Sequence, residues 1–200
     1  MIHKVTSVMA RTKAFDKDEV LDKAVDLFWQ KGYQGTSAQD IVDCLGISRS
    51  SLYDTFGDKH TLFVAALKRY KSKMGNPFIE IIEQTEDAKK AIHQIFQMIL
   101  DESIDQKCNK GCFMVNATME LSQVDPEITA IINRNTQDME EAFCMAIEKG
   151  QKMGTISTVH DPRKIALFLI NAISGLRVTA KTDIDRAKLN DIVCLTISIL

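Results

Sequence analysis

Apolar residues recur along this chain at the spacing of amphipathic helices, with short polar breaks between the repeats. Between residues 16 and 31 they fall on one helical stripe, and Gly32 follows where a left-handed residue ends a helix at little cost. Ser37 and Asp40 then have the spacing of a capping box, and Gly46 stands where the second helix should stop. The pattern predicts two consecutive helices with defined ends.

The next segment predicts a third, short helix whose outer surface is polar. Ser48 is placed to cap it, and its apolar positions are only Leu52 and Phe56. Two helices joined by a tight turn form a helix-turn-helix, in which the second helix enters the major groove of DNA. We therefore predict a DNA-reading element; the alternative is an ordinary helical hairpin whose polar residues only cap and solvate.

Side-chain chemistry selects the residues that would contact DNA. Arginine bonds guanine bidentately and serine pairs with several base edges, so Arg49 and Ser50 are the expected base readers, with Ser51 as a further one. Lys59 opens a further helix, where its charge and the free amides of the helix N-terminus can hold a phosphate, assisted by His60.

A wider set of positions recurs at fixed spacing over roughly the first third of the chain. It comprises Phe15, the apolar stripe, Gly32-Tyr33-x-Gly35-Thr36-Ser37, Ile41, Gly46-Ile47-Ser48, Leu52-Tyr53-x-x-Phe56 and Lys59-x-x-Leu62. Together these closely resemble the TetR/AcrR family of bacterial transcriptional regulators. The resemblance implies an all-helical homodimer that binds double-stranded operator DNA, usually as a repressor released by a small-molecule inducer.

Carried over residue by residue, the resemblance puts Thr36, Tyr53 and Lys59 at phosphate-contacting positions and the residues from 49 to 51 at groove-facing ones. Asp54 and Thr55 depart from the His or aromatic residue that many members carry there, which leaves the operator sequence open. The expected DNA-binding residues are Thr36, Ser37, Ser48, Arg49, Ser50, Ser51, Tyr53, Thr55, Lys59 and His60.

The rest of the chain continues as apolar helical patterns and requires no strand, so the predicted fold class is all-α. A three-helix helix-turn-helix domain is followed by a larger helical ligand-binding and dimerisation domain. After the linking helix, further helices are expected over about 77–84, 87–104, 111–122, 126–149, 162–181 and 185–200. The expected domains are a flexible arm at 1–14, the DNA-binding domain at 15–60, the linking helix at 61–76, and the ligand-binding and dimerisation domain at 77–200.

The last two predicted helices are apolar over more than one face and must be buried on several sides. We expect them to form a homodimer interface, a purely intrachain core being the alternative. An inducer site is expected between the helices from 87 to 149; for each lining residue, core packing is the alternative. The expected lining residues are Phe96, Met98, Cys112, Phe113, Asn116, Met119, Met139 and Phe143.

Cys108-Asn-Lys-Gly-Cys112 is the one local chemical feature of this region. Lys107, Lys110 and the helix start near Gly111 would favour the thiolate of Cys112, which allows a regulator that senses oxidants or electrophiles through this thiol. The alternative is a small buried thiol. Cys-x3-Cys lacks a second pair of ligands nearby, so neither a metal site nor a cofactor is expected.

Composition changes this picture little. The formal net charge is −2, and residues 1–60 hold eight Lys and Arg against nine Asp and Glu, so whole-chain charge does not indicate nucleic acid. Basic residues cluster locally instead, on the arm and at the end of the linking helix. Five scattered cysteines suit a reducing compartment.

We expect a cytoplasmic protein, because no run approaches the roughly 18 apolar residues of a membrane span and the N-terminus lacks a signal-peptide core. Catalysis is not expected either, since the chain has no Gly-rich phosphate loop, no Gly-x-Ser-x-Gly elbow and no His-Glu-x-x-His helix. A thiol-dependent enzyme that uses Cys112 is the remaining catalytic alternative.

Overall fold

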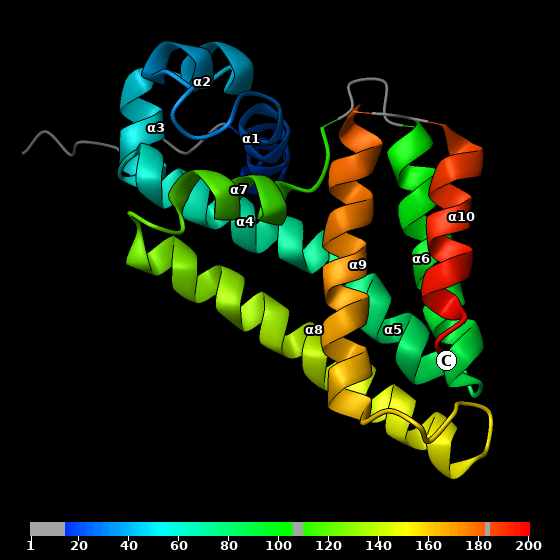
Figure 1. The fold of residues 1–200 in the computed structure, drawn as a ribbon. Coiled ribbons are helices and arrows are strands. Elements are labelled where there is room, and N and C mark those ends of the chain that lie inside the picture. The colour runs from blue at the N-terminus through cyan, green and yellow to red at the C-terminus, as the bar shows by residue number, and fades with distance from the viewer. Residues whose placement is uncertain (1–14, 106–109, 183–184) are drawn as a thin grey trace, which may run out of the picture.

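The computed structural model describes residues 15–105, 110–182 and 185–200, and every regular element among them is an α-helix (Figure 1). The all-α prediction is confirmed. The expected arm at 1–14 and Cys108 lie outside the described residues. The helices are α1 Lys17–Lys31, α2 Ala38–Leu45, α3 Arg49–Phe56, α4 Lys59–Met74, α5 Asn76–Gln84, α6 Ala88–Asp105, α7 Phe113–Leu121, α8 Pro126–Lys152, α9 Pro162–Thr182 and α10 Arg186–Ile197.

The ends of α2 and α3 follow from local hydrogen bonding, as the sequence predicts. Ser37 and Asp40 complete a capping box at the start of α2, and Gly46 ends that helix in the left-handed region at φ 65°. The Ser48 hydroxyl accepts the Ser51 amide at 3.1 Å and so caps α3. Because each end is fixed locally, the turn between the two helices is short and defined.

The long helix α8 continues past its predicted end at residue 149. It runs through Gly150, where a Cβ atom would lie 2.7 Å from Cδ1 of Ile156. The chain after α8 folds back tightly onto the helix at this point, and only a residue without a side chain leaves the room. Gly154, at φ 75°, makes the turn that follows the helix.

The helices divide into two groups that α4, α7 and α8 connect (Figure 1). The short helices α2 and α3 lie with α1 at one end of the molecule, where α1 packs along α4. At the other end α6, α9 and α10 stand side by side, and α8 packs against α9. Helix α3 therefore lies at the opposite end of the molecule from α9 and α10 (Figure 1).

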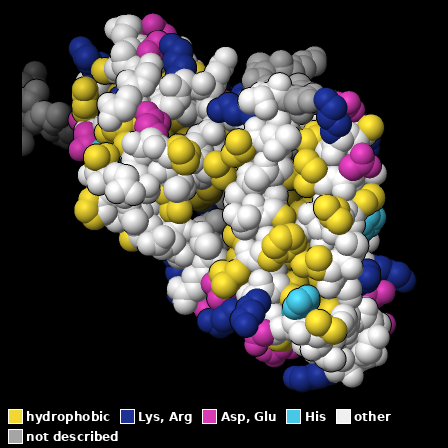
Figure 2. Space-filling model, viewed as in Figure 1, with side chains coloured by type: hydrophobic (Ala, Val, Ile, Leu, Met, Phe, Trp, Pro, Cys, Tyr) yellow, Lys and Arg dark blue, Asp and Glu magenta, His cyan; other side chains and the backbone are white. Residues whose placement is uncertain are grey.

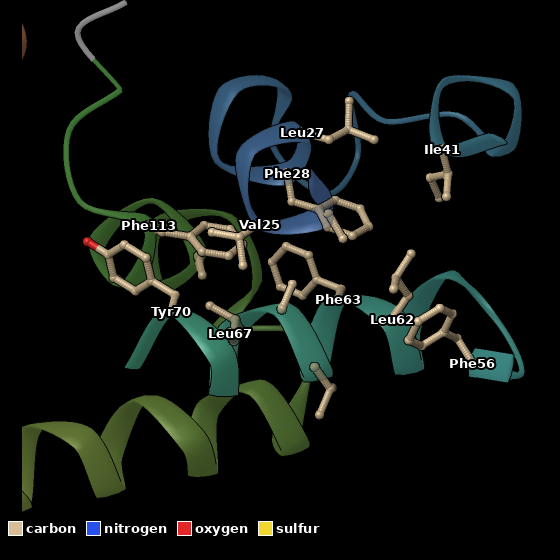
Figure 3. Packing of buried hydrophobic residues seen from close by; sticks show 14 of the residues in the cluster. Val25, Leu27, Phe28, Ile41, Phe56, Leu62, Phe63, Leu67, Tyr70 and Phe113 are labelled. Atoms are coloured by element: carbon tan, nitrogen blue, oxygen red, sulfur yellow. The ribbon is translucent and has the colours of Figure 1, made fainter. Parts of the chain in front are cut away.

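The core of the N-terminal helices extends into α7. Phe113 of α7 lies edge-to-face between Phe63 and Tyr70 of α4, with ring centroids 5.4 and 5.6 Å apart. Phe63 makes the same kind of contact with Phe28 of α1 at 5.0 Å. Figure 3 shows these rings meeting between α1, α4 and α7. This aromatic cluster, Phe28, Phe63, Tyr70 and Phe113, joins α7 to the helices that hold the helix-turn-helix.

Helix α9 is long and apolar enough to cross a membrane by length and composition, with a mean hydropathy of 1.3 over an 18-residue window. The expectation that no run approaches this limit is therefore wrong for α9. In the structure, 39% of this window is buried against the core. Other apolar residues of α9, such as Leu167, Phe168 and Val178, are exposed. One such helix is weak support for a span, because core helices have the same composition.

The aromatic cluster generates a stability prediction. Replacing Phe113, which is 1% exposed, with alanine removes its ring contacts to Phe63 and Tyr70 of α4 and leaves a cavity, so we expect a loss of about 3–5 kcal/mol in the free energy of unfolding. Met119→Ala on the same helix is the control, because Met119 is 84% exposed and its loss should cost less than about 0.5 kcal/mol. Urea unfolding followed by circular dichroism measures both; similar values for the two variants would contradict the shared core.

Candidate DNA-binding surface and ligand cavity

Helix α3 buries its apolar side and presents a polar surface. Leu52 and Phe56 are 2% and 5% exposed, whereas Arg49, Ser50 and Tyr53 face solvent. Arg49 makes no hydrogen bond or ion pair with any residue that the structure describes. Its guanidinium therefore keeps its donors available, which is the state that reading a guanine edge requires.

All four of the expected DNA-contacting serines have local bonding partners. The Ser37 hydroxyl donates to the Asp40 carboxylate at 2.8 Å within the capping box. The Ser48 hydroxyl donates to the hydroxyl of Ser51 at 2.9 Å and lies 3.0 Å from that of Ser50. Ser37 and Ser48 thus hold helix starts, while Ser50 and Ser51 lie beside the cap on the exposed first turn of α3.

The structure corrects two of the expected DNA contacts. Thr36 is 1% exposed, and its hydroxyl donates to the carbonyl of Gly32 at 2.6 Å, so its side chain stabilises the turn before α2. The Thr55 hydroxyl is buried and has no hydrogen-bond partner among the described residues. Neither hydroxyl reaches the surface.

The start of α4 is more crowded than the sequence suggests. The Asp58 carboxylate accepts the Thr61 amide at 2.7 Å, and this bond lowers the pKa of Asp58. One amide at this helix start is thus already bonded, beside a negative charge. The Lys59 ammonium lies 4.3 Å above the Tyr33 ring, and the His60 Nε2 atom lies 2.7 Å from Oδ2 of Asp125. His60 therefore faces α8, which Asp125 caps.

A carboxylate on α7 holds the turn between α1 and α2. Glu120 accepts the backbone amide of Tyr33 at 2.9 Å and that of Gln34 at 2.6 Å. A Cβ atom on Gly32 would lie 3.0 Å from the same carboxylate, so the close approach uses a glycine. Sequence reasoning did not find this contact, because residues 87 positions apart carry no local signal of pairing.

A cavity of about 120 Å³ lies between the two groups of helices, with walls from α4, α5, α7, α8 and α9. Cys112 and Met139, both expected in the inducer site, line it. Apolar walls come also from Met74, Phe78 and Ile173. Small apolar cavities with a few polar groups are typical ligand sites.

The structure corrects the other expected lining residues. Phe113 belongs to the aromatic cluster, and Met119 is exposed to solvent. The Asn116 amide donates to the Lys110 carbonyl at 2.9 Å, away from the cavity. Met98 lines a separate outer groove on α6. In the core of the C-terminal helices lie Phe96 and Phe143.

A buried arginine on the cavity wall was missed. Arg177 is 7% exposed; its Nη1 donates to the Tyr70 hydroxyl and its Nη2 to Glu102, each at 3.4 Å. The Tyr70 hydroxyl donates to Sγ of Cys112 at 3.7 Å. Burial raises the pKa of Tyr70, so this hydroxyl stays protonated, and burial also raises the pKa of Glu102 against the opposing effect of Arg177. The available signal was Arg177 itself, the one charge between residues 164 and 181 of an apolar helix.

Two chemical expectations for this region change. Lys110, expected to favour the Cys112 thiolate, instead pairs with Asp26 of α1 at 3.0 Å. Arg177 and Lys71 are the cations that share the cavity wall with Cys112, and Lys71 is paired with Asp138. Within the described ranges, no group of three or more His, Cys, Asp or Glu side chains is arranged to hold a metal ion.

Comparison with known sequences finds transcriptional regulators over nearly the whole chain. A model of the bacterial regulatory proteins of the tetR family matches residues 20–66, and a model of the tetracyclin repressor-like C-terminal domain matches residues 88–194. The HTH-type transcriptional regulator YezE of Bacillus subtilis is 34% identical over 193 residues, covering 96% of this chain and 100% of the relative. The HTH-type transcriptional repressor ComR of Escherichia coli is 30% identical over 94% of this chain and 90% of its own length.

Solved structures share the fold. The TetR family regulator CifR, as a cysteine mutant complexed with 26-bp double-strand operator DNA, superposes with a TM-score of 0.82 at 24% identity, covering 94% of this chain and 98% of that one. The reduced form of E. coli NemR has a TM-score of 0.79 at 18% identity, covering 91% and 95%. At these identities the likeness concerns the fold alone.

The contact between α7 and the turn before α2 generates a prediction. Glu120→Gln removes the charge and one of the two acceptor oxygens. We expect the turn to lose ~1.4 kcal/mol of local stability, so the amides of Tyr33 and Gln34 should exchange with solvent deuterium at least about tenfold faster. Glu83→Gln is the matched control, because Glu83 is exposed on α5. Unchanged exchange at both amides, measured by NMR, would show that Glu120 does not hold the turn.

Proposed function

The chain belongs to the tetR family of bacterial regulatory proteins, and on that premise we propose that it is a homodimeric repressor of a palindromic operator, released by a small-molecule inducer. Its family consists of DNA-binding transcriptional regulators and not of enzymes. The observation that carries the proposal is α3, an eight-residue capped helix that buries its apolar residues and exposes Arg49, Ser50 and Tyr53.

We assign the DNA contacts to five members of the expected set, of which three are exposed and two, Ser51 and Lys59, are half-buried. Arg49 and Ser50 read bases from the first turn of α3, with Ser51 beside them, because these groups reach solvent at the end of the helix that enters the groove. Tyr53, which is 46% exposed, and Lys59 contact phosphates. The exposed carboxylate of Asp54 either accepts from a cytosine amine or repels phosphate, so it influences which operator is bound.

We assign the homodimer interface to α9 and α10, which expose apolar residues in positions that no neighbouring helix covers. Figure 2 shows hydrophobic side chains over this face of the molecule. A Cβ atom on Gly175 of α9 would meet nothing within 4 Å, so a second copy can approach the helix closely there. A two-fold dimer would set two α3 helices about one DNA turn, ~34 Å, apart. The exposed apolar residues are Leu167, Phe168, Val178, Ile192 and Leu195.

Three contacts support coupling between the cavity and the DNA-binding helices. The aromatic cluster and Glu120 tie α7 to α1 and to the turn before α2, and His60 ties the start of α4 to Asp125 at the start of α8. Both α7 and α8 also line the cavity. A ligand that prefers a different arrangement of these helices would shift the population of dimers away from operator spacing. The linking helix α4 is thus one of three connections.

A specific contact favours thiol sensing as a second candidate. Cys112 lies on the cavity wall within 3.7 Å of the Tyr70 hydroxyl and beside Arg177. Oxidation or alkylation of this thiol would add volume and polarity at the place where an inducer would sit. The expected partner thiol, Cys108, lies outside the described residues. Cytoplasmic localisation is part of both proposals, because a bacterial operator is found there.

Selection of bound duplexes from a randomised pool, with purified protein at near-physiological salt, tests the proposed function. We expect a palindrome whose half-sites lie about one helical turn apart. Release of the enriched duplex by small molecules or by oxidants, compared in wild type and Cys112→Ser, then separates the two candidates. Failure of a folded dimer to enrich any sequence would refute operator binding.

Base reading and phosphate contact predict different responses. Arg49→Ala should relax preference at one base position by about 1–3 kcal/mol. Lys59→Ala should weaken binding to all duplexes and lower the slope of log affinity against log salt by about one unit. Fluorescence anisotropy with the enriched operator and single-base variants measures both, with Lys164→Ala, exposed on α9, as the control. Equal weakening on every duplex by both variants would refute the assignment.

The dimer interface has a matched pair of test variants. Leu195→Glu on α10, where the side chain is 74% exposed, should place two like charges in the interface and convert the dimer to a monomer with lost operator affinity. Val159→Glu is the control, since Val159 is 79% exposed in the connection between α8 and α9. Light scattering after size exclusion gives the mass; a dimeric Leu195→Glu protein would place the interface elsewhere.

A further inference from the structure

The cavity carries one buried positive charge on its wall, and we infer that the inducer is a small carboxylic acid bound as its anion. The inference rests on the proposed function, because it names the chemical class of ligand for the proposed inducer site. Its starting point is Arg177, whose guanidinium lines the cavity although the residue is 93% buried, as its exposed fraction of 7% states. The other cation of the wall, Lys71, is 27% exposed and paired with Asp138. The remaining walls are mostly apolar, so Arg177 determines what an occupant must offer.

Arg177 is under-bonded for a buried guanidinium. The group has five N–H donors. Its hydrogen bonds to described residues are those to Tyr70 and Glu102, both at 3.4 Å, beyond the usual 2.7–2.9 Å of a charge-assisted bond. The ring of Phe78 lies 6.0 Å from its central carbon and adds only a weak cation–π contact. Planar donors of this kind match a carboxylate, which accepts two parallel bonds.

The paired carboxylate lies on the other side of Arg177. Glu102 belongs to α6 and lines the separate outer groove, not the cavity. Met74 lines both spaces, so the Arg177–Glu102 pair lies where groove and cavity adjoin. The other acid of the groove, Asp101, is paired with Arg186 at 2.7 Å. The charge that faces the cavity is therefore positive, and a cationic occupant would find no carboxylate there.

The size of the cavity limits the acid. Its volume is about 120 Å³. An engineered apolar cavity of ~150 Å³ holds one benzene molecule. The walls beside Arg177 offer Met74, Phe78 and Ile173 for apolar contact, whereas the hydroxyls of Thr118 and Ser174 already donate to backbone carbonyls of their own helices. Because the cavity here is smaller than the engineered one, it fits a short aliphatic monocarboxylate, with its carboxylate on Arg177 and its apolar part among these side chains.

Binding of an acid would change the packing of α9. Arg177 now joins α9 to Glu102 of α6 and to Tyr70 of α4. A ligand carboxylate competes with Glu102 for the same guanidinium, so the acid replaces an interhelical contact with a contact to itself. Helix α9 also carries the proposed dimer interface. Replacing the Glu102 contact by the ligand therefore lets the acid bind one arrangement of the helices more tightly than the other, which induction requires.

Calorimetric titration of the full-length dimer with a panel of acids tests the inference. The panel comprises the linear acids from acetate to octanoate and benzoate, each with its primary amide. We expect at least one acid to bind and to release the enriched operator, and its amide to bind at least tenfold more weakly. Glu102→Gln should tighten the acid at least severalfold, because the competing charge is removed.

The arginine is tested without leaving a buried charge unpaired. The double variant Arg177→Met with Glu102→Gln removes both charges, and acid affinity should fall at least tenfold. Arg163→Met is the control, because this arginine is 64% exposed on the same helix. Circular dichroism and operator affinity of the double variant establish that it is folded. If the double variant does not fold, the sign of the Glu102→Gln effect and the acid-to-amide ratio decide the question.

Three results would overturn the inference while leaving the proposed function intact. These are that wild type binds its operator but none of the acids, that acids and amides bind equally, or that the folded double variant keeps its acid affinity. Failure of the proposed function is a different observation, namely that no operator is enriched by the folded dimer.

Discussion

Edge-to-face packing of Phe63 against Phe28 and Phe113 is the contact on which the arrangement of this molecule depends. It places residues from α1, α4 and α7 in one core, so the helices around the helix-turn-helix cannot be packed independently of a helix that borders the cavity. Protein cores are close-packed, and a shift of one helix is therefore transmitted to its neighbours and not absorbed. The polar contacts of Glu120 and His60 act at the edge of this core, where they fix the turn before α2 and the start of α8.

The recognition surface works with little net charge. Helix α3 presents one arginine and one aspartate, and the acids near it are largely engaged in structural contacts: Asp40 bonds Lys31 at 2.6 Å, and Asp58 caps α4. Bonding to Lys31 and to Ser37 holds the pKa of Asp40 below its usual range, so this acid stays ionised within its pair. If the proposed contacts are made, affinity for DNA depends on a few cations at defined positions, which makes geometry more important than the overall field.

The cavity combines features that stability alone would not select. A buried arginine with two long hydrogen bonds is costly, since its desolvation is only partly offset by Glu102 and Tyr70. Replacing such a pair by apolar residues is often neutral or stabilising in other proteins. Cys112 adds a thiol to the same wall. Local departures from good bonding of this kind are concentrated where proteins bind ligands.

Local sequence determined the helices and most of their ends, because capping and glycine preferences act within a few residues: Ser37, Gly46 and Ser48 behave as their chemistry predicts. It also determined which side of α3 is exposed. Tertiary structure alone decided the rest. In the sequence, Phe113 looks the same whether it lines a cavity or fills a core. Only the position of α7 across α4 puts it in the aromatic cluster. The opposite holds for Arg177, whose charge is visible in the sequence but whose place on the cavity wall depends on how five helices meet. Pattern along a chain reports which face of a helix is apolar; what that face packs against is fixed by contacts between residues far apart in sequence.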